Sequence, residues 1–208
     1  TSENFSGQGR DGFGYGPRDY SLAGFPHFRD VTFEGNFPVA KLVFTDSDFP
    51  ARISLCAFNP FIPHDEFNSS LPAAFFEWEI ENLVNEKIDI AIACTVRNPA
   101  QSSKNKKIVT DQESGLFLGS SNIDENDIGY SDLCILTDHP DVVVQEYWHR
   151  ARRQDSCMTY WKNLSSLERM PERSYPDPSK NDHGTGASYI ALAPKETKKI
   201  RFVIAWNV

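Results

Sequence analysis

The sequence lacks the long apolar run that a membrane span requires. No stretch approaches the roughly 20 consecutive apolar residues that cross a bilayer, and the first residues show no hydrophobic signal region. Basic residues are also scarce, because 21 Lys and Arg face 29 Asp and Glu, which leaves a formal net charge of −8. Nucleic acid binding needs a clustered positive surface, so the composition argues against a nucleic acid partner. We therefore expect a soluble acidic protein without a membrane span, located in the cytoplasm.

Motifs for metal binding and nucleophilic catalysis are missing as well. The four cysteines have no C-x-x-C spacing and the five histidines form no H-x-x-x-H pair, so we expect neither a disulfide framework nor a zinc site. Composition alone leaves a Ser-His-Asp triad open, but no G-x-S-x-G elbow supports one. The run from Asp124 to Gly129 begins like a calcium loop, yet Ile128 and Ile135 stand where oxygen ligands are needed. We interpret this run as a surface turn and expect no metal and no cofactor.

The Gly-rich stretch GQGRDGFGYG, residues 7–16, fits the G-x-G-x-x-G pattern of dinucleotide-binding loops. That pattern works only where a strand leads into the first glycine and a helix begins after the last. Here six residues precede Gly7, and Gly14, Gly16 and Pro17 would break a helix in its first turns. We therefore interpret residues 1–24 as a Gly-rich segment of little order that leads into the folded domain.

Alternation of apolar and polar residues, which is typical of half-buried strands, runs through the rest of the chain. The alternating runs are residues 29–35, 40–44, 51–58, 75–82, 86–97, 115–119, 132–137, 187–194 and 198–206. Clusters rich in Gly, Pro, Asp and Asn separate them and predict turns. Many short strands with few helical patterns predict one all-β domain over residues 25–208, an antiparallel β-sandwich with one short helix and long loops.

Three segments allow more detailed predictions. Residues 75–82 and 86–97 each carry apolar side chains on one face, and the short connection between them predicts a hairpin. Residues 155–166 place Cys157, Trp161 and Leu164 on one helical face, which predicts the single helix. The basic run from Lys104 to Lys107 is short, and we interpret it as a solvated turn.

Two groups of side chains are candidates for a functional role. Glu77 and Glu79 project from one strand face roughly 7 Å apart, near the carboxylate spacing of some glycosidases. Alternating Glu residues are, however, more often the solvent face of a strand. The aromatic residues Tyr147, Trp148, Tyr160 and Trp161 could stack on sugar rings or contact another domain. The alternative is that these rings pack the helix onto the sheet.

Four long stretches of the sequence resemble a known protein family. They are FEGNFPVAKLVF at 33–44, the run from Phe49 to Asn82, IDIAIACTVRN at 88–98 and the run from Asp182 to Val208. In this order they resemble the N-terminal domain of glycoside hydrolase family 116, which includes the non-lysosomal glucosylceramidase and bacterial β-glucosidases. The resemblance covers roughly residues 25–208 and is more specific for the family than for a sugar or an aglycone.

The resemblance implies a β-sandwich that packs against a C-terminal α/α barrel in the same polypeptide. The catalytic carboxylates of these retaining β-glycosidases lie in that barrel and have no counterpart in the 208 residues, so no catalytic residue is carried over. The chain is then a non-catalytic domain that supports the barrel, is inactive alone and self-associates through its exposed interface. Two alternatives stay open: a free-standing carbohydrate-binding or structural module that contacts β-glucosides, and an enzyme that uses Glu77 and Glu79.

Overall fold

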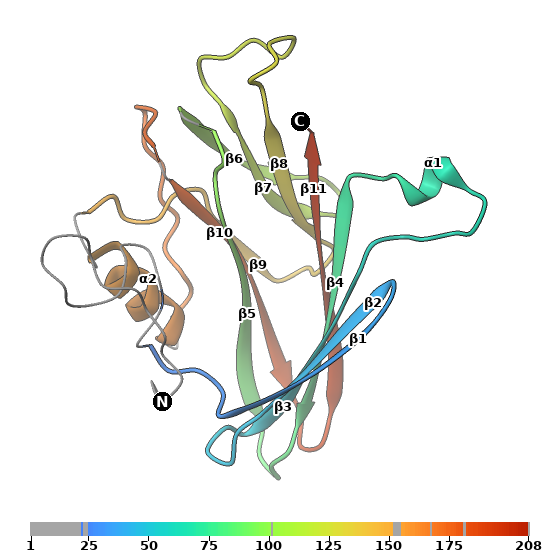
Figure 1. Cartoon of the computed structure of the whole chain (residues 1–208). Helices are drawn as coiled ribbons and strands as arrows, with labels where there is room; N and C mark the ends of the chain where they lie inside the picture. Colours follow the sequence, from blue (N-terminus) through green and yellow to red (C-terminus); the bar gives the residue numbers. More distant parts are fainter. Residues whose placement is uncertain are drawn as a thin grey trace, which may run out of the picture.

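The structure is a computed structural model that describes residues 22, 25–100, 102–151, 155–166, 168–180 and 182–207 (Figure 1). Apart from Leu22, the Gly-rich segment 1–24 lies outside the described residues. The strands are β1 (Asp30–Asn36), β2 (Val39–Thr45), β3 (Ala51–Phe58), β4 (Ala73–Asn82), β5 (Ile88–Arg97), β6 (Ser103–Val109), β7 (Ser114–Ser120), β8 (Asp132–Thr137), β9 (Val142–Gln145), β10 (His183–Leu192) and β11 (Thr197–Asn207). The helices are α1 (Glu66–Ser69) and α2 (Asp155–Ser165).

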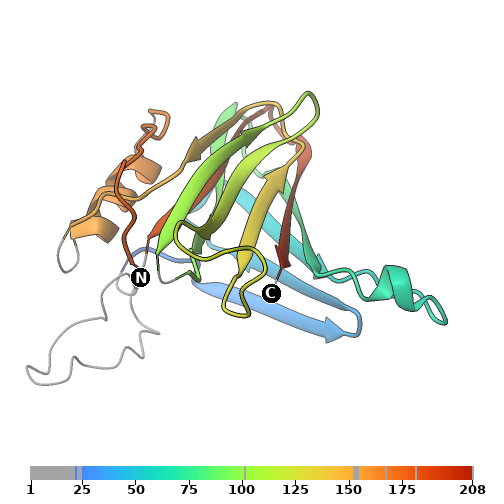
Figure 2. The ribbon, with the colours of Figure 1, turned by 90° about the horizontal axis from the view of Figure 1, so that it is seen from above.

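The strands form two antiparallel sheets that face each other. The larger sheet has eight strands in the order β1-β2-β3-β4-β11-β8-β7-β6, and the smaller has three in the order β5-β10-β9. Figure 2 shows α2 on one side of the sandwich, while the β1–β2 ribbon and the connection with α1 extend on the opposite side. The architecture is the predicted all-β sandwich, and the alternating runs of the sequence correspond to nine of its strands.

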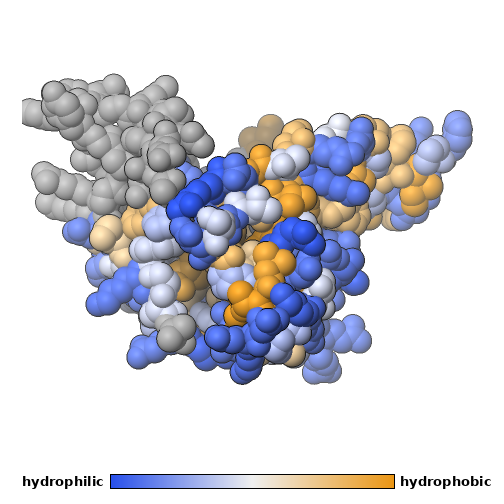
Figure 3. All heavy atoms as spheres, turned by 90° about the horizontal axis from the view of Figure 1, so that it is seen from below, coloured by the Kyte–Doolittle hydropathy of each residue, from blue (hydrophilic) through white to orange (hydrophobic). Residues whose placement is uncertain are grey.

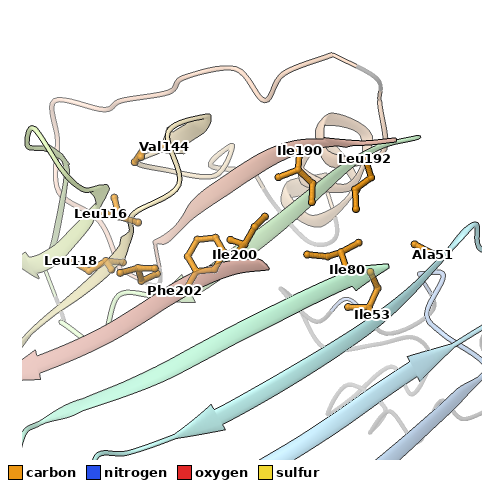
Figure 4. Packing of buried hydrophobic residues seen from close by; sticks show 11 residues of the cluster. Ala51, Ile53, Ile80, Leu116, Leu118, Val144, Ile190, Leu192, Ile200 and Phe202 are labelled. Atoms are coloured by element: carbon orange, nitrogen blue, oxygen red, sulfur yellow. The ribbon is translucent and has the colours of Figure 1, made fainter. Parts of the chain in front are cut away.

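The main hydrophobic core lies between the two sheets (Figure 4). The larger sheet contributes Ile80 from β4 and Ile200 and Phe202 from β11, all almost fully buried. The smaller sheet contributes Ile190 and Leu192 from β10. Because alternate residues of a strand point to opposite faces, each of these strands offers one apolar row to this core.

The predicted hairpin of residues 75–82 and 86–97 is wrong. β4 pairs with β3 and β11, whereas β5 pairs with β10 in the other sheet. The chain changes sheets at Asn82, whose buried amide donates to the carbonyls of Glu86 (2.7 Å) and Ala193 (2.9 Å) and accepts from the N–H of Val84 (2.9 Å). Both apolar faces therefore enter one core from opposite sides instead of lying side by side.

Helix α2 adds a third layer behind the smaller sheet. The second face of β5 carries small residues, and Ala93 packs in a separate cluster with Cys157 and Tyr160 of α2. Ala187 of β10 belongs to the same cluster. The helix forms where the sequence predicts it because its apolar stripe has this sheet face to cover.

The basic run from Lys104 to Lys107 is part of strand β6 and not a solvated turn. Ser103 and Asn105 point inward, and both are buried and hydrogen-bonded, while Lys104 and Lys106 face solvent. The inward row is polar, so the apolar alternation that marks other strands is missing. β6 is one of the two edge strands of the larger sheet, and lysines on such an edge oppose pairing with other chains.

Candidate functional site

Three of the four candidate aromatic residues are buried. Tyr147, Trp148 and Tyr160 are each no more than 5% exposed. The Trp148 ring is stacked between Tyr160 of α2, with centroids 4.1 Å apart, and His183 of β10, with centroids 4.8 Å apart. These rings hold α2 on the smaller sheet, and their faces are covered by neighbouring side chains of the same domain.

A chain of hydrogen bonds runs beneath these rings. The indole Nε1 of Trp148 donates to Oγ1 of Thr185 (2.9 Å), which is 2.7 Å from Oγ1 of Thr95. Thr95 in turn donates to the hydroxyl of Tyr160 (3.1 Å). Burial raises the pKa of Tyr160, and the hydrogen bond from Thr95 opposes this shift. The polar atoms of the stack are thus satisfied internally.

Tyr147 contacts Arg150, which binds the segment that precedes β10. The Arg150 guanidinium lies over the rings of both Tyr147 (5.0 Å) and Tyr175 (4.3 Å), which meet each other edge to face. It donates two hydrogen bonds to Asp182, of 2.9 and 2.8 Å, and these raise the pKa of Arg150 above its usual value. Ser103 also donates to Asp182, so the segment is tied to β6.

Trp161 differs from the other three because it is half-exposed. It lines a cavity of about 260 Å³ together with Phe28, Phe49, Asp46 and Asp48. The pKa of Asp46 lies below its usual range, chiefly because the backbone N–H of Asp48 donates to its carboxylate. An aromatic wall with nearby carboxylates is an arrangement that suits a sugar ring.

Glu77 and Glu79 lie on the outer face of the larger sheet, away from the core. Arg201 of β11 is 3.1 Å from Glu77, and Lys199 of the same strand is 3.4 Å from Glu79. A depression of about 390 Å³ on this face is lined by both carboxylates and by Lys199 and Lys41. The two carboxylates therefore belong to rows of opposite charges across neighbouring strands.

The run from Asp124 to Gly129 forms exposed turns closed by its own side chains. The carboxylate of Asp124 accepts from the backbone N–H and the side-chain amide of Asn126, both at 2.9 Å. Asp127 accepts from the N–H of Gly129 at 2.7 Å. Within the part of the chain that the structure describes, no group of three or more His, Cys, Asp or Glu side chains could hold a metal ion.

Among the described residues, the two most exposed aromatic side chains, Phe37 and Phe67, lie on a surface that the sequence did not indicate. It comprises Phe37 in the β1–β2 turn and Phe61, Ile62, Phe67 and Leu71 in the β3–β4 connection, and we call it the distal aromatic surface. Phe37 and Phe67 are 82% and 80% exposed, and Phe61 is 50% exposed. The rings of Phe37 and Phe61 meet edge to face with centroids 5.0 Å apart, so the two connections form one surface.

The β3–β4 connection, residues 59–72, projects from the sandwich as an arm. Hydrophobic and hydrophilic residues lie side by side on its surface (Figure 3). Ser69 closes the arm, because its hydroxyl donates to the carbonyl of Ile62 (3.0 Å) and accepts from the N–H of Ile62 (2.9 Å). Asp65 caps α1 by accepting from the N–H of Asn68 (3.0 Å), and this bond holds the pKa of Asp65 below its usual range. The arm has a defined fold, although α1 buries none of its residues.

A comparison with known protein families decides the identity of the domain. A family described as "beta-glucosidase 2, glycosyl-hydrolase family 116 N-term" matches residues 4–208. The chain belongs to this family. The resemblance carried by the strings at 33–44, 49–82, 88–98 and 182–208 is thereby confirmed over almost the whole length.

Among solved structures, the family 116 N-terminal domain is similar to part of a "Putative kojibiose phosphorylase from human microbiome". The two are 9% identical in sequence, with a TM-score of 0.42. The match covers 81% of this chain and 18% of the solved chain, so this chain spans less than a fifth of that protein. In the described residues of the family 116 domain, no helix is long and apolar enough to cross a membrane.

Proposed function

We propose that this chain is a non-catalytic accessory domain of a retaining β-glycosidase and supports a C-terminal α/α barrel in the same polypeptide. The observation that carries this proposal is the match of residues 4–208 to a family defined as the N-terminal part of family 116 hydrolases. The exposed, apolar distal aromatic surface also supports it, because such a surface is expected on a domain that packs against another.

The geometry of the acidic pair supports a non-catalytic role. A retaining glycosidase places two carboxyl groups about 5 to 5.5 Å apart on either side of the scissile bond and needs their pKa values to differ. Glu77 and Glu79 instead stand two residues apart on the same face of β4, each beside a cation of β11. An open sheet face also leaves water in contact with any bound sugar, which weakens electrostatic stabilisation of a transition state.

Hydrolysis of an aryl β-glucoside tests this function. We expect no turnover by the 208-residue chain, and we expect kcat of a polypeptide that includes the catalytic part to stay unchanged in the Glu77→Gln and Glu79→Gln variants. Turnover by the 208-residue chain that disappears in Glu77→Gln would show instead that the sandwich itself is the enzyme.

A second candidate function is a carbohydrate-binding module that contacts β-glucosides, and the cavity beside Trp161 favours it. Stacking of a sugar on this half-exposed indole would change its fluorescence. Titration with β-glucosides should then give a saturable change that Trp161→Ala abolishes and Met158→Ala, an exposed position on the same helix, preserves. A flat titration would remove this candidate.

The proposed location is the cytoplasm. All four cysteines, Cys56, Cys94, Cys134 and Cys157, are free thiols, which is the state that a reducing compartment maintains. Subcellular fractionation of the source cells tests this assignment, and recovery of the polypeptide with secreted proteins would overturn it.

A further inference from the structure

We infer that the distal aromatic surface is the face that docks onto the catalytic part of the polypeptide. This inference rests on the proposed function and adds which residues make the contact. The occupant is an apolar surface on the catalytic part that receives the rings of Phe37, Phe61 and Phe67. The docked arm, residues 59–72, lies between the sandwich and that surface.

The distal aromatic surface exposes a large apolar area. Phe37, Phe61 and Phe67 are 82%, 50% and 80% exposed, and Ile62 and Leu71 are also exposed. Since a Phe side chain offers roughly 150 to 250 Å² for burial, the five residues together present several hundred Å² of apolar surface. This is as large as the largest patch that a monomeric protein usually leaves in water, and such patches are often functional.

The arm has a defined local structure although its apolar residues are exposed. Its polar groups bond locally, as Ser69 with Ile62 and Asp65 with Asn68 show, while its apolar side chains are exposed. Local bonds of this kind are ordinary in turns and helix caps, so here they show that the arm has a defined shape. The arm therefore holds its exposed apolar residues on a defined backbone, ready for contact with another protein surface.

The charges beside the distal aromatic surface favour the catalytic part over a second copy of this chain as the surface that covers it. Residues 59–72 contain two carboxylates, Asp65 and Glu66, and neither Lys nor Arg. Two copies that met through this surface would bring equal acidic groups together around an apolar centre, which is unfavourable. A partner surface with an apolar centre and a basic rim avoids this repulsion, and we assign that surface to the catalytic part.

The last strand ends close to the distal aromatic surface. The N–H of Trp206 in β11 donates to the carbonyl of Pro72 (3.0 Å), and Ala205 pairs with Ala73 at the start of β4. The end of β11 thus lies at the base of the arm (Figure 1). Any domain that follows β11 begins beside the distal aromatic surface, so a short connection is sufficient for docking.

Amide hydrogen exchange tests the inference with the 208-residue chain and with the polypeptide in which the catalytic part follows it. We expect exchange in residues 59–72 and in the β1–β2 turn to slow at least tenfold in the longer polypeptide. The Phe37→Ser/Phe67→Ser double variant should lose this protection, whereas Ile128→Ser, at a fully exposed residue outside the surface, should keep it.

The outcomes separate the inference from the proposed function. Protection that appears elsewhere, for example on the outer face around Glu77 and Lys199, would overturn the docking surface and leave the accessory role intact. Equal exchange over the whole domain in both polypeptides would overturn both. Concentration-dependent protection of residues 59–72 in the 208-residue chain alone would assign the surface to a second copy and would also overturn the inference.

Discussion

Close contact between the two sheets depends on small residues, and Gly184 shows this most clearly. A Cβ atom on Gly184 of β10 would lie 2.2 Å from Cδ2 of Leu116 and 3.1 Å from the carbonyl oxygen of Glu146. Leu116 is fully buried, so it has little room to move away. The substitution therefore overpacks the core at the point where β10 crosses β7.

We expect Gly184→Ala to lower the free energy of unfolding by about 1 to 3 kcal/mol, the usual range for overpacked cores. Urea denaturation measures this directly. Gly129→Ala is the matched control, because Gly129 is exposed and its Cβ would meet only a side-chain oxygen of Asp127 at 3.2 Å. Equal stability of the two variants would show that the sheets adjust more easily than the contact with Leu116 implies.

Residue chemistry also predicts how stability depends on pH. Burial raises the pKa of the Cys94 thiol in β5 to about 11, above the value near 8.5 of an unfolded chain. A raised pKa means that the folded state holds its proton more tightly, so this contribution to stability is complete below the unfolded pKa. It is lost as the pH rises toward 11.

Urea denaturation between pH 8 and pH 11 checks this prediction. Stability should fall with rising pH more steeply in the unsubstituted chain than in Cys94→Ala, which has no thiol to titrate. Cys94→Ala also leaves a cavity, but that loss is constant with pH and does not change the slope. Parallel curves would contradict the assignment.

At the scale of secondary structure elements, the stack beneath α2 joins a helix to a sheet. Trp148 contacts Tyr160 of α2 on one side and His183 of β10 on the other. We expect Trp148→Ala to cost about 3 to 5 kcal/mol of stability, as for large aromatic residues removed from a core. Met158→Ala, at an exposed position of the same helix, should cost less than about 0.5 kcal/mol. Similar urea midpoints for both variants would show that the stack does not hold the helix.

The elements also show what the sequence could predict. Strands such as β4 and β11 were predictable because their alternation records which residues face the core. Pairing was not, since an apolar row on β5 fits the core equally well from either sheet. The bonds that Asn82 makes where the chain changes sheets depend on partners that the alternation does not identify. β6 was missed because its buried residues, Ser103 and Asn105, are polar and are satisfied by partners distant in sequence.

The candidate site shows the same limit. Alternation indicated that Glu77 and Glu79 share a strand face, but not that Arg201 and Lys199 of β11 lie beside them. The distal aromatic surface was visible only as Phe residues between prolines in residues 59–72, without Lys or Arg. Whether such residues turn inward or outward depends on the tertiary fold, and here the core is filled without them.

At the scale of the whole molecule, one family 116 domain presents three different surfaces. The outer face of the larger sheet carries paired charges, the opposite side of the sandwich is covered by α2, and the distal aromatic surface is apolar and exposed. Of these three surfaces, the distal aromatic surface exposes the largest apolar area. Docking through it therefore gives the largest hydrophobic contribution to the free energy of association. A domain that docks in this way gains stability from its partner, because anything that binds only the folded state opposes unfolding.

Differential scanning calorimetry tests the central claim, that the sandwich is an accessory domain coupled to a catalytic part. The two samples are the 208-residue chain and the polypeptide in which the catalytic part follows it. We predict that the sandwich unfolds several degrees higher in the longer polypeptide, in one transition with the catalytic part. A separate transition at the temperature found for the 208-residue chain would contradict the account, because it would show that the two parts do not stabilise each other.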